Sequence, residues 1–153
     1  QYCQLKKSIS TMKKLSIIVV LLSVSTSIFG QVYTSPEYTR KSNPHMEVVK
    51  IIITDKYTIV EFKHTNPYEV GGYANIFPET VIRTNKGQTF KLQKVKNIPV
   101  APYRHNYRKK GEVLRFKLYF PPINPSTKSI DIVESEGNKQ AFNVYKIKLI
   151  PMA

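Results

Sequence analysis

Cysteine, tryptophan and glycine are scarce in this chain of 153 residues, which contains one Cys, no Trp and six Gly. A single cysteine cannot form a disulfide within the chain, so a disulfide-stapled fold is excluded. That cysteine, Cys3, also precedes the segment interpreted below as an export signal. A mature chain without thiols cannot be a thiol oxidoreductase, use a Cys nucleophile or form a cysteine-based zinc site.

Acidic residues are also few, with ten Asp and Glu against 24 Lys and Arg. General acid–base catalysis needs groups that face one another across a cleft, and no spacing of the carboxylates marks such a pair. The three histidines, His45, His64 and His105, lie on separate segments, and we interpret them as polar surface side chains rather than metal ligands. Serine-nucleophile and phosphate-loop motifs are lacking. The sequence therefore predicts a protein that is not an enzyme and binds no metal ion or cofactor.

The longest apolar run, residues 15–24, follows a basic segment that ends at Lys14 and precedes small residues up to Gly30. A basic region, an apolar run and a small-residue cleavage site are typical of a secretory signal peptide. We therefore predict a signal peptide over residues 12–30, cleaved between Gly30 and Gln31. An uncleaved anchor is the alternative, although a membrane-spanning helix needs about 20 apolar residues.

Residues 1–11 precede Met12, the expected initiator, and are interpreted as a non-native upstream extension. Removal of residues 1–30 takes away four lysines and no acid, so the mature chain keeps 20 basic and 10 acidic residues and loses its cysteine. This chain is expected to be exported to the periplasm, the cell surface or the medium. It is also expected to contain no transmembrane segment.

The residue pattern of the mature chain changes at Met46. Residues 31–45 show no apolar periodicity and are interpreted as a flexible spacer, whereas residues 46–150 alternate β-branched and aromatic runs with turn signals. Strands are expected over residues 46–54, 57–64, 74–83, 88–95, 112–120, 129–135 and 141–150. About seven short antiparallel strands predict an all-β fold, a single immunoglobulin-like β-sandwich, with a small barrel as the alternative. The expected core positions are Val49, Ile51, Val60, Phe62, Phe90, Leu92, Leu114, Phe116, Leu118, Ile130, Ile132, Tyr145 and Ile147.

Positive charge is concentrated in one stretch of the sequence. Between Arg83 and Lys117 there are eleven basic residues and one acid, Glu112. Arg and Lys bind phosphate or carboxylate, and tyrosine rings stack on sugars or bases. The middle of the stretch is therefore the candidate anionic-ligand site, and its residues are Tyr103, Arg104, His105, Tyr107, Arg108, Lys109 and Lys110. The alternative is a solvated basic loop flanked by lysines that protect strand edges.

The C-terminal segments resemble a known group of domains. Residues 116–123 follow an F-x-L-x-F-x-P pattern, residues 129–134 an I-D-x-x-E pattern and residues 142–149 an F-x-x-Y-x-I-x-L pattern. In this order they are similar to an immunoglobulin-like β-sandwich domain of unknown function in secreted bacterial envelope proteins. The resemblance spans about residues 46–150. It implies an envelope location and a domain found alone or ahead of thioredoxin-like, repeat or peptidase modules, and it supplies no catalytic residue.

These observations favour a secreted or periplasmic non-catalytic binding module that contacts an anionic envelope component through its basic loop. The expected partner is a protein or an anionic glycan or lipid of the cell envelope, and no specific nucleic acid is expected. A structural envelope protein without a ligand is one alternative, and a hydrolase with an unrecognised site is the other.

Overall fold

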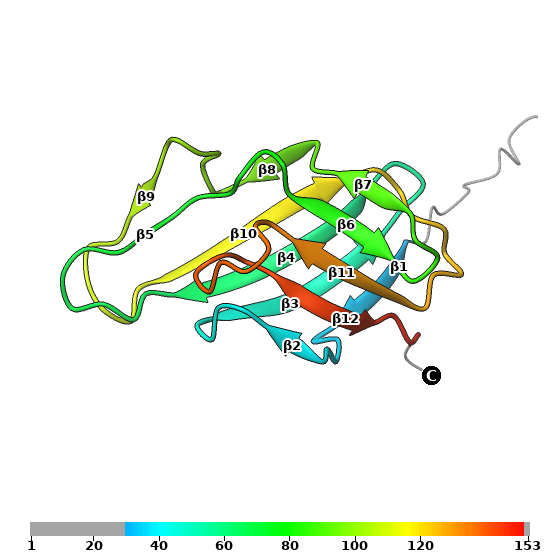
Figure 1. The fold of residues 1–153 in the computed structure, drawn as a ribbon, viewed down its shortest axis with the longest axis horizontal. Helices are drawn as coiled ribbons and strands as arrows, with labels where there is room; N and C mark the ends of the chain where they lie inside the picture. Colours follow the sequence, from blue (N-terminus) through cyan, green and yellow to red (C-terminus); the bar gives the residue numbers. More distant parts are fainter. Residues whose placement is uncertain (1–29, 152–153) are drawn as a thin grey trace, which may run out of the picture.

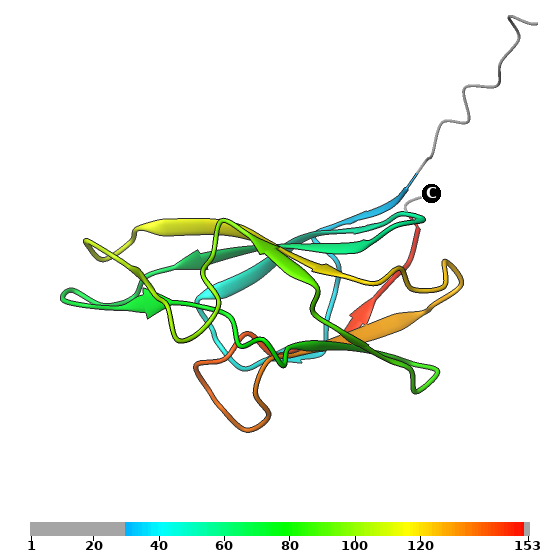
Figure 2. The same ribbon diagram turned by 90° about the horizontal axis from the view of Figure 1, so that it is seen from above.

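The computed structural model describes residues 30–151, which form twelve β-strands and no helix. The predicted extension and signal peptide lie outside the described residues, apart from Gly30 at the boundary of the cleavage site. Two five-stranded antiparallel sheets face each other, and the core fills the space between them (Figures 1 and 2). The described part of the chain contains no helix that is long and apolar enough to span a membrane.

Sheet A has the strand order β1-β3-β4-β10-β8, and sheet B has the order β2-β12-β11-β6-β7. The strands of sheet A are β1 (Gln31–Thr34), β3 (Met46–Ile53), β4 (Thr58–Thr65), β10 (Val113–Phe120) and β8 (Lys94–Lys96). Those of sheet B are β2 (Arg40–Lys41), β12 (Val144–Lys148), β11 (Ser129–Val133), β6 (Val81–Thr84) and β7 (Thr89–Lys91). A third, two-stranded sheet pairs β5 (Tyr73–Ala74) with β9 (His105–Asn106) at one end of the molecule (Figure 1).

The three longest strands, β3, β4 and β10, lie next to one another in the middle of sheet A. In β4 and β10 every second side chain is buried, as period-two patterning requires when one face of a sheet packs on the core. Phe62 of β4 and Phe116 of β10 stack with their ring centroids 5.3 Å apart, and Phe142 packs against both. This aromatic cluster lies under the end of the sandwich that carries β5 and β9.

The predicted all-β class is confirmed, and nine of the predicted core side chains are buried. These nine are Ile51, Val60, Phe62, Leu114, Phe116, Leu118, Ile130, Ile132 and Ile147. Phe90 and Leu92 are partly buried against the same core. The remaining two, Val49 and Tyr145, are outside the core, so these predictions are wrong.

Two β-bulges explain both errors. A register shift between Val48 and Lys50 moves the core position from Val49 to Val48. A second bulge lies at Tyr145 and Lys146, which together oppose Asp131; Lys146 has a φ of +53°, and its backbone N–H donates to Asp131 Oδ1. A bulge adds one residue to a strand, so the residues on either side of it exchange faces.

Several short strands raise the number from the predicted seven to twelve. The predicted spacer over residues 31–45 is wrong, because β1 and β2 lie in it and Tyr33 is buried. The predicted strand over residues 88–95 is divided between β7 of sheet B and β8 of sheet A, so the chain crosses between the layers there. The predicted strand over residues 74–83 is broken: Pro78, which has no N–H to donate, lies between β5 and β6, which are separate strands.

Candidate functional site

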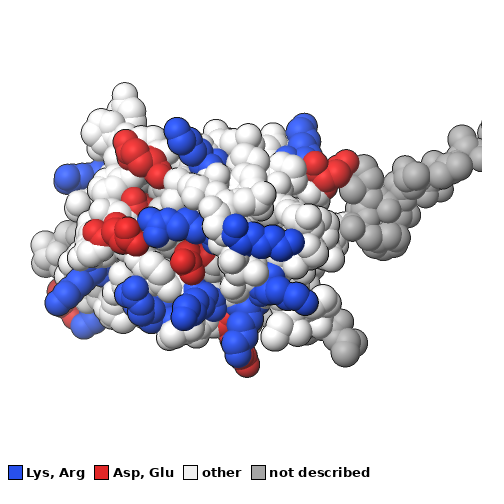
Figure 3. Space-filling model, turned by 45° about the vertical axis from the view of Figure 1, so that its right-hand side comes forward, with Lys and Arg blue, Asp and Glu red and all other residues white. Residues whose placement is uncertain are grey.

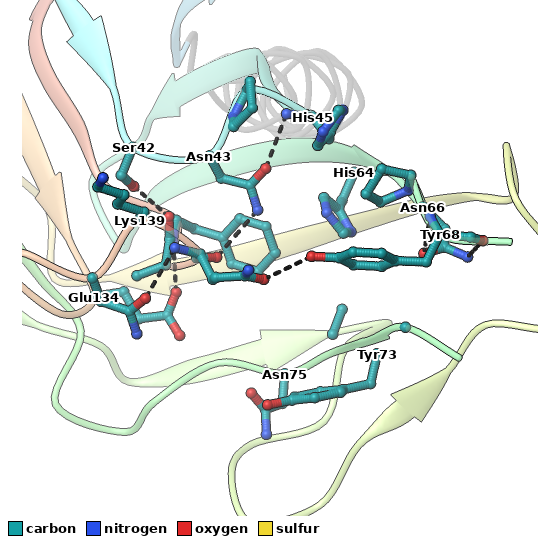
Figure 4. A pocket seen from close by; sticks show the side chains of 18 of the residues that line it. Ser42, Asn43, His45, His64, Asn66, Tyr68, Tyr73, Asn75, Glu134 and Lys139 are labelled. Atoms are coloured by element: carbon teal, nitrogen blue, oxygen red, sulfur yellow. Dashed lines mark hydrogen bonds between the residues drawn. The ribbon is translucent and has the colours of Figure 1, made fainter. Parts of the chain in front are cut away.

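A pocket of about 610 Å³ opens at the end of the sandwich near β5. Three connections form its walls: residues 42–45 between β2 and β3, residues 66–77 around β5, and residues 134–142 between β11 and β12. The end of β4 contributes His64 to the floor (Figure 4). Segments far apart in the sequence thus meet at one site, as is common for binding sites carried on loops of a rigid scaffold.

The floor of the pocket is a buried histidine. His64 Nδ1 lies 2.6 Å from the hydroxyl of Tyr107, and the imidazole ring packs edge-on against Phe142 at 5.3 Å. Burial, and to a lesser degree the neighbouring His45, lower the pKa of His64 to about 4. The ring is therefore neutral at pH 7, and the interpretation of His64 as a surface side chain is wrong.

A buried carboxylate ties two walls together. Glu134 Oε2 accepts the backbone N–H of Phe142 at 2.7 Å, and Oε1 accepts that of Phe77 at 3.3 Å. Burial raises the pKa of this carboxyl although both hydrogen bonds favour its ionised form. Because each oxygen already accepts a backbone donor, the arrangement is that of a tether rather than of a free acid or base.

The mouth of the pocket carries two half-exposed tyrosines, Tyr68 and Tyr73, with exposed fractions of 45% and 49%. The Tyr68 hydroxyl reaches across the pocket and donates to Gln140 Oε1 at 3.3 Å (Figure 4). Asn75 follows β5 and donates from Nδ2 to the carbonyl oxygen of Tyr103 at 3.0 Å. The wall of the pocket is thus joined directly to the predicted basic loop.

A glycine shapes the turn between the two tyrosines. Gly72 has a φ of +94°, and a Cβ atom at this position would lie 2.3 Å from Asn66 Oδ1. The amide of Asn66 needs that space, because its Nδ2 donates to the carbonyl oxygens of Tyr68 and Lys109 at 3.2 and 3.0 Å. This buried amide therefore connects the pocket wall to the basic loop a second time.

The predicted anionic-ligand residues contact this wall but do not line the pocket, and their exposures differ. Tyr103 is 76% exposed, and the guanidinium of Arg104 stacks over the ring of Tyr73 at 4.0 Å. Lys110 pairs with Glu69 at 2.8 Å, whereas Lys109 is exposed. The inclusion of Tyr107 is wrong, because its side chain is buried against His64 and is inaccessible to a ligand.

Glu112 organises the rest of the basic loop. It accepts the backbone N–H of Arg108 at 2.7 Å and lies 3.8 Å from the half-buried ring of His105. The hydrogen bond from Arg108 is the main cause that lowers the pKa of Glu112. The single acid of the basic stretch therefore holds the loop in its conformation.

The eleven cations of the basic stretch do not form one patch. Arg83 and Lys91 lie on sheet B, Lys96 and Lys117 lie on sheet A, and the residues around Arg104 lie at the end near the pocket. Figure 3, which views the molecule obliquely from the side of sheet B, shows Lys and Arg spread over this face with Asp and Glu among them. The concentration of charge in the sequence is thus separated in space into three groups.

The pocket itself was not predicted from the sequence. Its residues are ordinary loop residues, and the turn signal at Gly71-Gly72 marks a bend without indicating what faces it. Within residues 30–151 no three His, Cys, Asp or Glu side chains are grouped as metal ligands would be. The polar groups at the mouth instead suit hydrogen bonding and stacking.

No protein-family model matches the chain, and comparisons with curated proteins and with solved structures find no significant match. The resemblance to bacterial envelope domains therefore stays a prediction.

Proposed function

We propose that this chain is an exported, non-catalytic binding module of the cell envelope. Its immunoglobulin-like β-sandwich would present an acidic glycan in the pocket beside the basic loop. The observation that carries the proposal is the stacking of Arg104 on Tyr73, because it places a cation directly beside a tyrosine that lines the pocket. Uronic-acid sugars offer both a ring for stacking and a carboxylate for a guanidinium.

The groups available to a ligand support this chemistry. Within the described residues no hydrogen bond occupies the Tyr73 hydroxyl, the Lys139 ammonium or the ring nitrogens of His45, and all three residues line the pocket. The volume of about 610 Å³ lies within the usual range for small-ligand sites. A sugar could therefore stack on tyrosine while its acidic group meets Arg104 or Lys139.

A hydrolase is less well supported by the same pocket. Glu134 is the one described carboxylate in its lining, and both of its oxygens accept backbone N–H groups. His64 is neutral and held by Tyr107. Glycoside hydrolysis usually uses two carboxylates that flank the scissile bond, and this lining provides one.

Calorimetric titration with uronic-acid oligosaccharides and with their neutral counterparts tests the proposal. We expect binding of the acidic sugars only, and at least a tenfold loss of affinity in Tyr73→Ala and in Arg104→Gln. Lys128→Gln serves as the matched control, because Lys128 is an exposed cation remote from the pocket lining. Failure of every acidic sugar to bind would instead favour a structural envelope protein without a ligand.

A further inference from the structure

The outer face of sheet A carries cations that lie opposite one another. Lys96 of β8 is the cross-strand partner of Lys117 of β10, and Arg115 of β10 is the partner of Lys63 of β4. Like charges directly opposite one another destabilise a sheet. Six cations occupy this face against two carboxylates, and these residues are Lys50, Lys63, Lys94, Lys96, Arg115 and Lys117 against Glu47 and Glu61.

Few of these charges are neutralised. Among the described residues, the Lys63–Glu47 contact at 3.6 Å is the one ion pair on this face, and Glu61 is the cross-strand partner of both Lys50 and Lys117. Sheet B differs, because Arg83 pairs with Glu136 at 3.0 Å and Lys148 with Glu37 at 2.8 Å. Sheet B thus has two ion pairs, although Lys91 and Lys146 on its strands form none among the described residues.

A depression of about 420 Å³ lies where the cations are densest. β8 ends at Lys96, and Asn97, with a φ of +63°, turns the chain away while its side-chain amide donates to the carbonyl oxygen of Arg115. The lining of the depression includes the three cations Lys96, Arg115 and Lys117 and one carboxylate, that of Glu61. Three cations against one carboxylate leave this shallow hollow with a net positive charge, which suits a phosphate group.

An apolar row runs beside the cations across the same face. The cross-strand register places Val32, Ile52, Ile59 and Tyr119 in one line from β1 to β10. At its end the Lys94 ammonium lies 4.5 Å from the ring centroid of Tyr119 and 4.8 Å from that of Tyr57. Tyrosine, lysine and aliphatic side chains in such a band are typical of surfaces that meet the interface of a bilayer.

We propose that the outer face of sheet A docks on an anionic lipid bilayer, with a lipid phosphate in the depression bounded by Lys96, Arg115 and Lys117. The cations extend over β3, β4, β10 and β8, so they match a charged plane better than a single linear polyanion (upper layer in Figure 2). The apolar row favours a bilayer further, because a soluble polyanion offers it nothing to contact. This face is separate from the pocket, and the inference does not depend on the proposed glycan.

Co-sedimentation with phosphatidylcholine vesicles, with and without phosphatidylglycerol, tests the docking. The triple variant Lys96→Gln/Arg115→Gln/Lys117→Gln should lose about a hundredfold in affinity for anionic vesicles, since each cation near the surface contributes roughly a factor of five. The control Lys86→Gln/Lys91→Gln/Lys128→Gln removes the same charge from the side of sheet B and should lose much less. Equal losses in the two variants, or no binding of the unaltered protein, would overturn the proposal.

The lack of tryptophan allows a second readout. Tyr119→Trp places the protein's single tryptophan in the apolar row, and its emission should shift to the blue with anionic vesicles, whereas the emission of Tyr145→Trp on sheet B should not change. Inorganic phosphate and a soluble polyphosphate are tested as ligands in the same assay. If polyphosphate binds more tightly than vesicles while the emission of Tyr119→Trp stays unchanged, the face is a soluble-anion site and the bilayer assignment is wrong.

Discussion

The His64 imidazole and the Tyr107 hydroxyl lie 2.6 Å apart beneath the pocket, and this contact joins β4 to the segment that follows β9. Both side chains are buried, so neither can exchange its partner for bulk water. His105 packs edge-on against Tyr107 with ring centroids 5.0 Å apart. The floor of the pocket and the underside of the basic loop are therefore one packed unit.

Removal of the Tyr107 hydroxyl should destabilise the protein. Tyr107→Phe leaves His64 Nδ1 buried without a partner, which costs about 1–3 kcal/mol. Tyr103→Phe removes a hydroxyl from a side chain that is 76% exposed and should leave stability unchanged. Urea denaturation of the two variants measures the difference, and equal midpoints would contradict the assigned role of Tyr107.

The buried histidine makes stability depend on pH. Since the pKa of folded His64 is about 4, below its usual value of 6.5, the folded state keeps the ring neutral while the unfolded chain takes up a proton. The free energy of unfolding should therefore fall as the pH falls from about 6.5 to about 4, by roughly 3 kcal/mol. Denaturation at several pH values in this window measures the slope.

Glu134 has the opposite effect on the pH dependence of the free energy of unfolding. The contribution of His64 must therefore be measured by comparison with a variant. The raised pKa of Glu134 stabilises the fold in acid, where the carboxyl is protonated, and this contribution is lost as the pH rises. His64→Gln removes the histidine term and leaves Glu134 in place. The difference between the slopes of the two proteins isolates His64, and identical slopes would show that the ring is accessible to protons in the folded state.

The period-two alternation of apolar and polar residues predicted the long strands correctly, and it gave wrong core positions where a β-bulge occurs. Period-two patterning in β4 and β10 leaves little freedom, because a slip by one residue would expose Phe62 or Phe116. Val49 and Tyr145 were assigned to the core by the same rule, which a single inserted residue reverses. β2 has two residues and no pattern, so only tertiary pairing with β12 defines it.

The sequence contained one unused signal for the site. His64 continues the inward positions of Val60 and Phe62, so the alternation of β4 already indicated a buried histidine. The pocket walls had no such signal. Glu134 meets the backbone of Phe77 across 57 residues of chain, and no local pattern predicts a contact of that range.

Two adjacent glycines allow a matched test of the pocket wall. Gly72 has a positive φ, and the Cβ that Gly72→Ala adds would lie only 2.3 Å from Asn66 Oδ1. The buried Asn66 amide must therefore move, which weakens its hydrogen bonds to the carbonyl oxygens of Tyr68 and Lys109. Gly71→Ala also has a positive φ, +74°, but meets nothing within 4 Å. We expect a loss of about 1 kcal/mol from strain in Gly71→Ala and a clearly larger loss in Gly72→Ala. Thermal denaturation ranks them, and equal losses would show that Asn66 does not require this space.

Stability and membrane binding should change in opposite directions at Lys96. Because Lys96 lies directly opposite Lys117, Lys96→Glu replaces a repulsive cross-strand pair by an attractive one and should stabilise the fold by a few tenths of a kcal/mol. The same change removes a cation from the proposed phosphate site and should weaken binding to anionic vesicles. Lys91→Glu changes the net charge by the same amount, but the cross-strand partner of Lys91 is Val81. We therefore expect smaller changes in stability and in vesicle binding for Lys91→Glu than for Lys96→Glu. A Lys96→Glu variant that is less stable than Lys91→Glu would contradict the repulsion, and one that binds vesicles as well as Lys91→Glu would contradict the site.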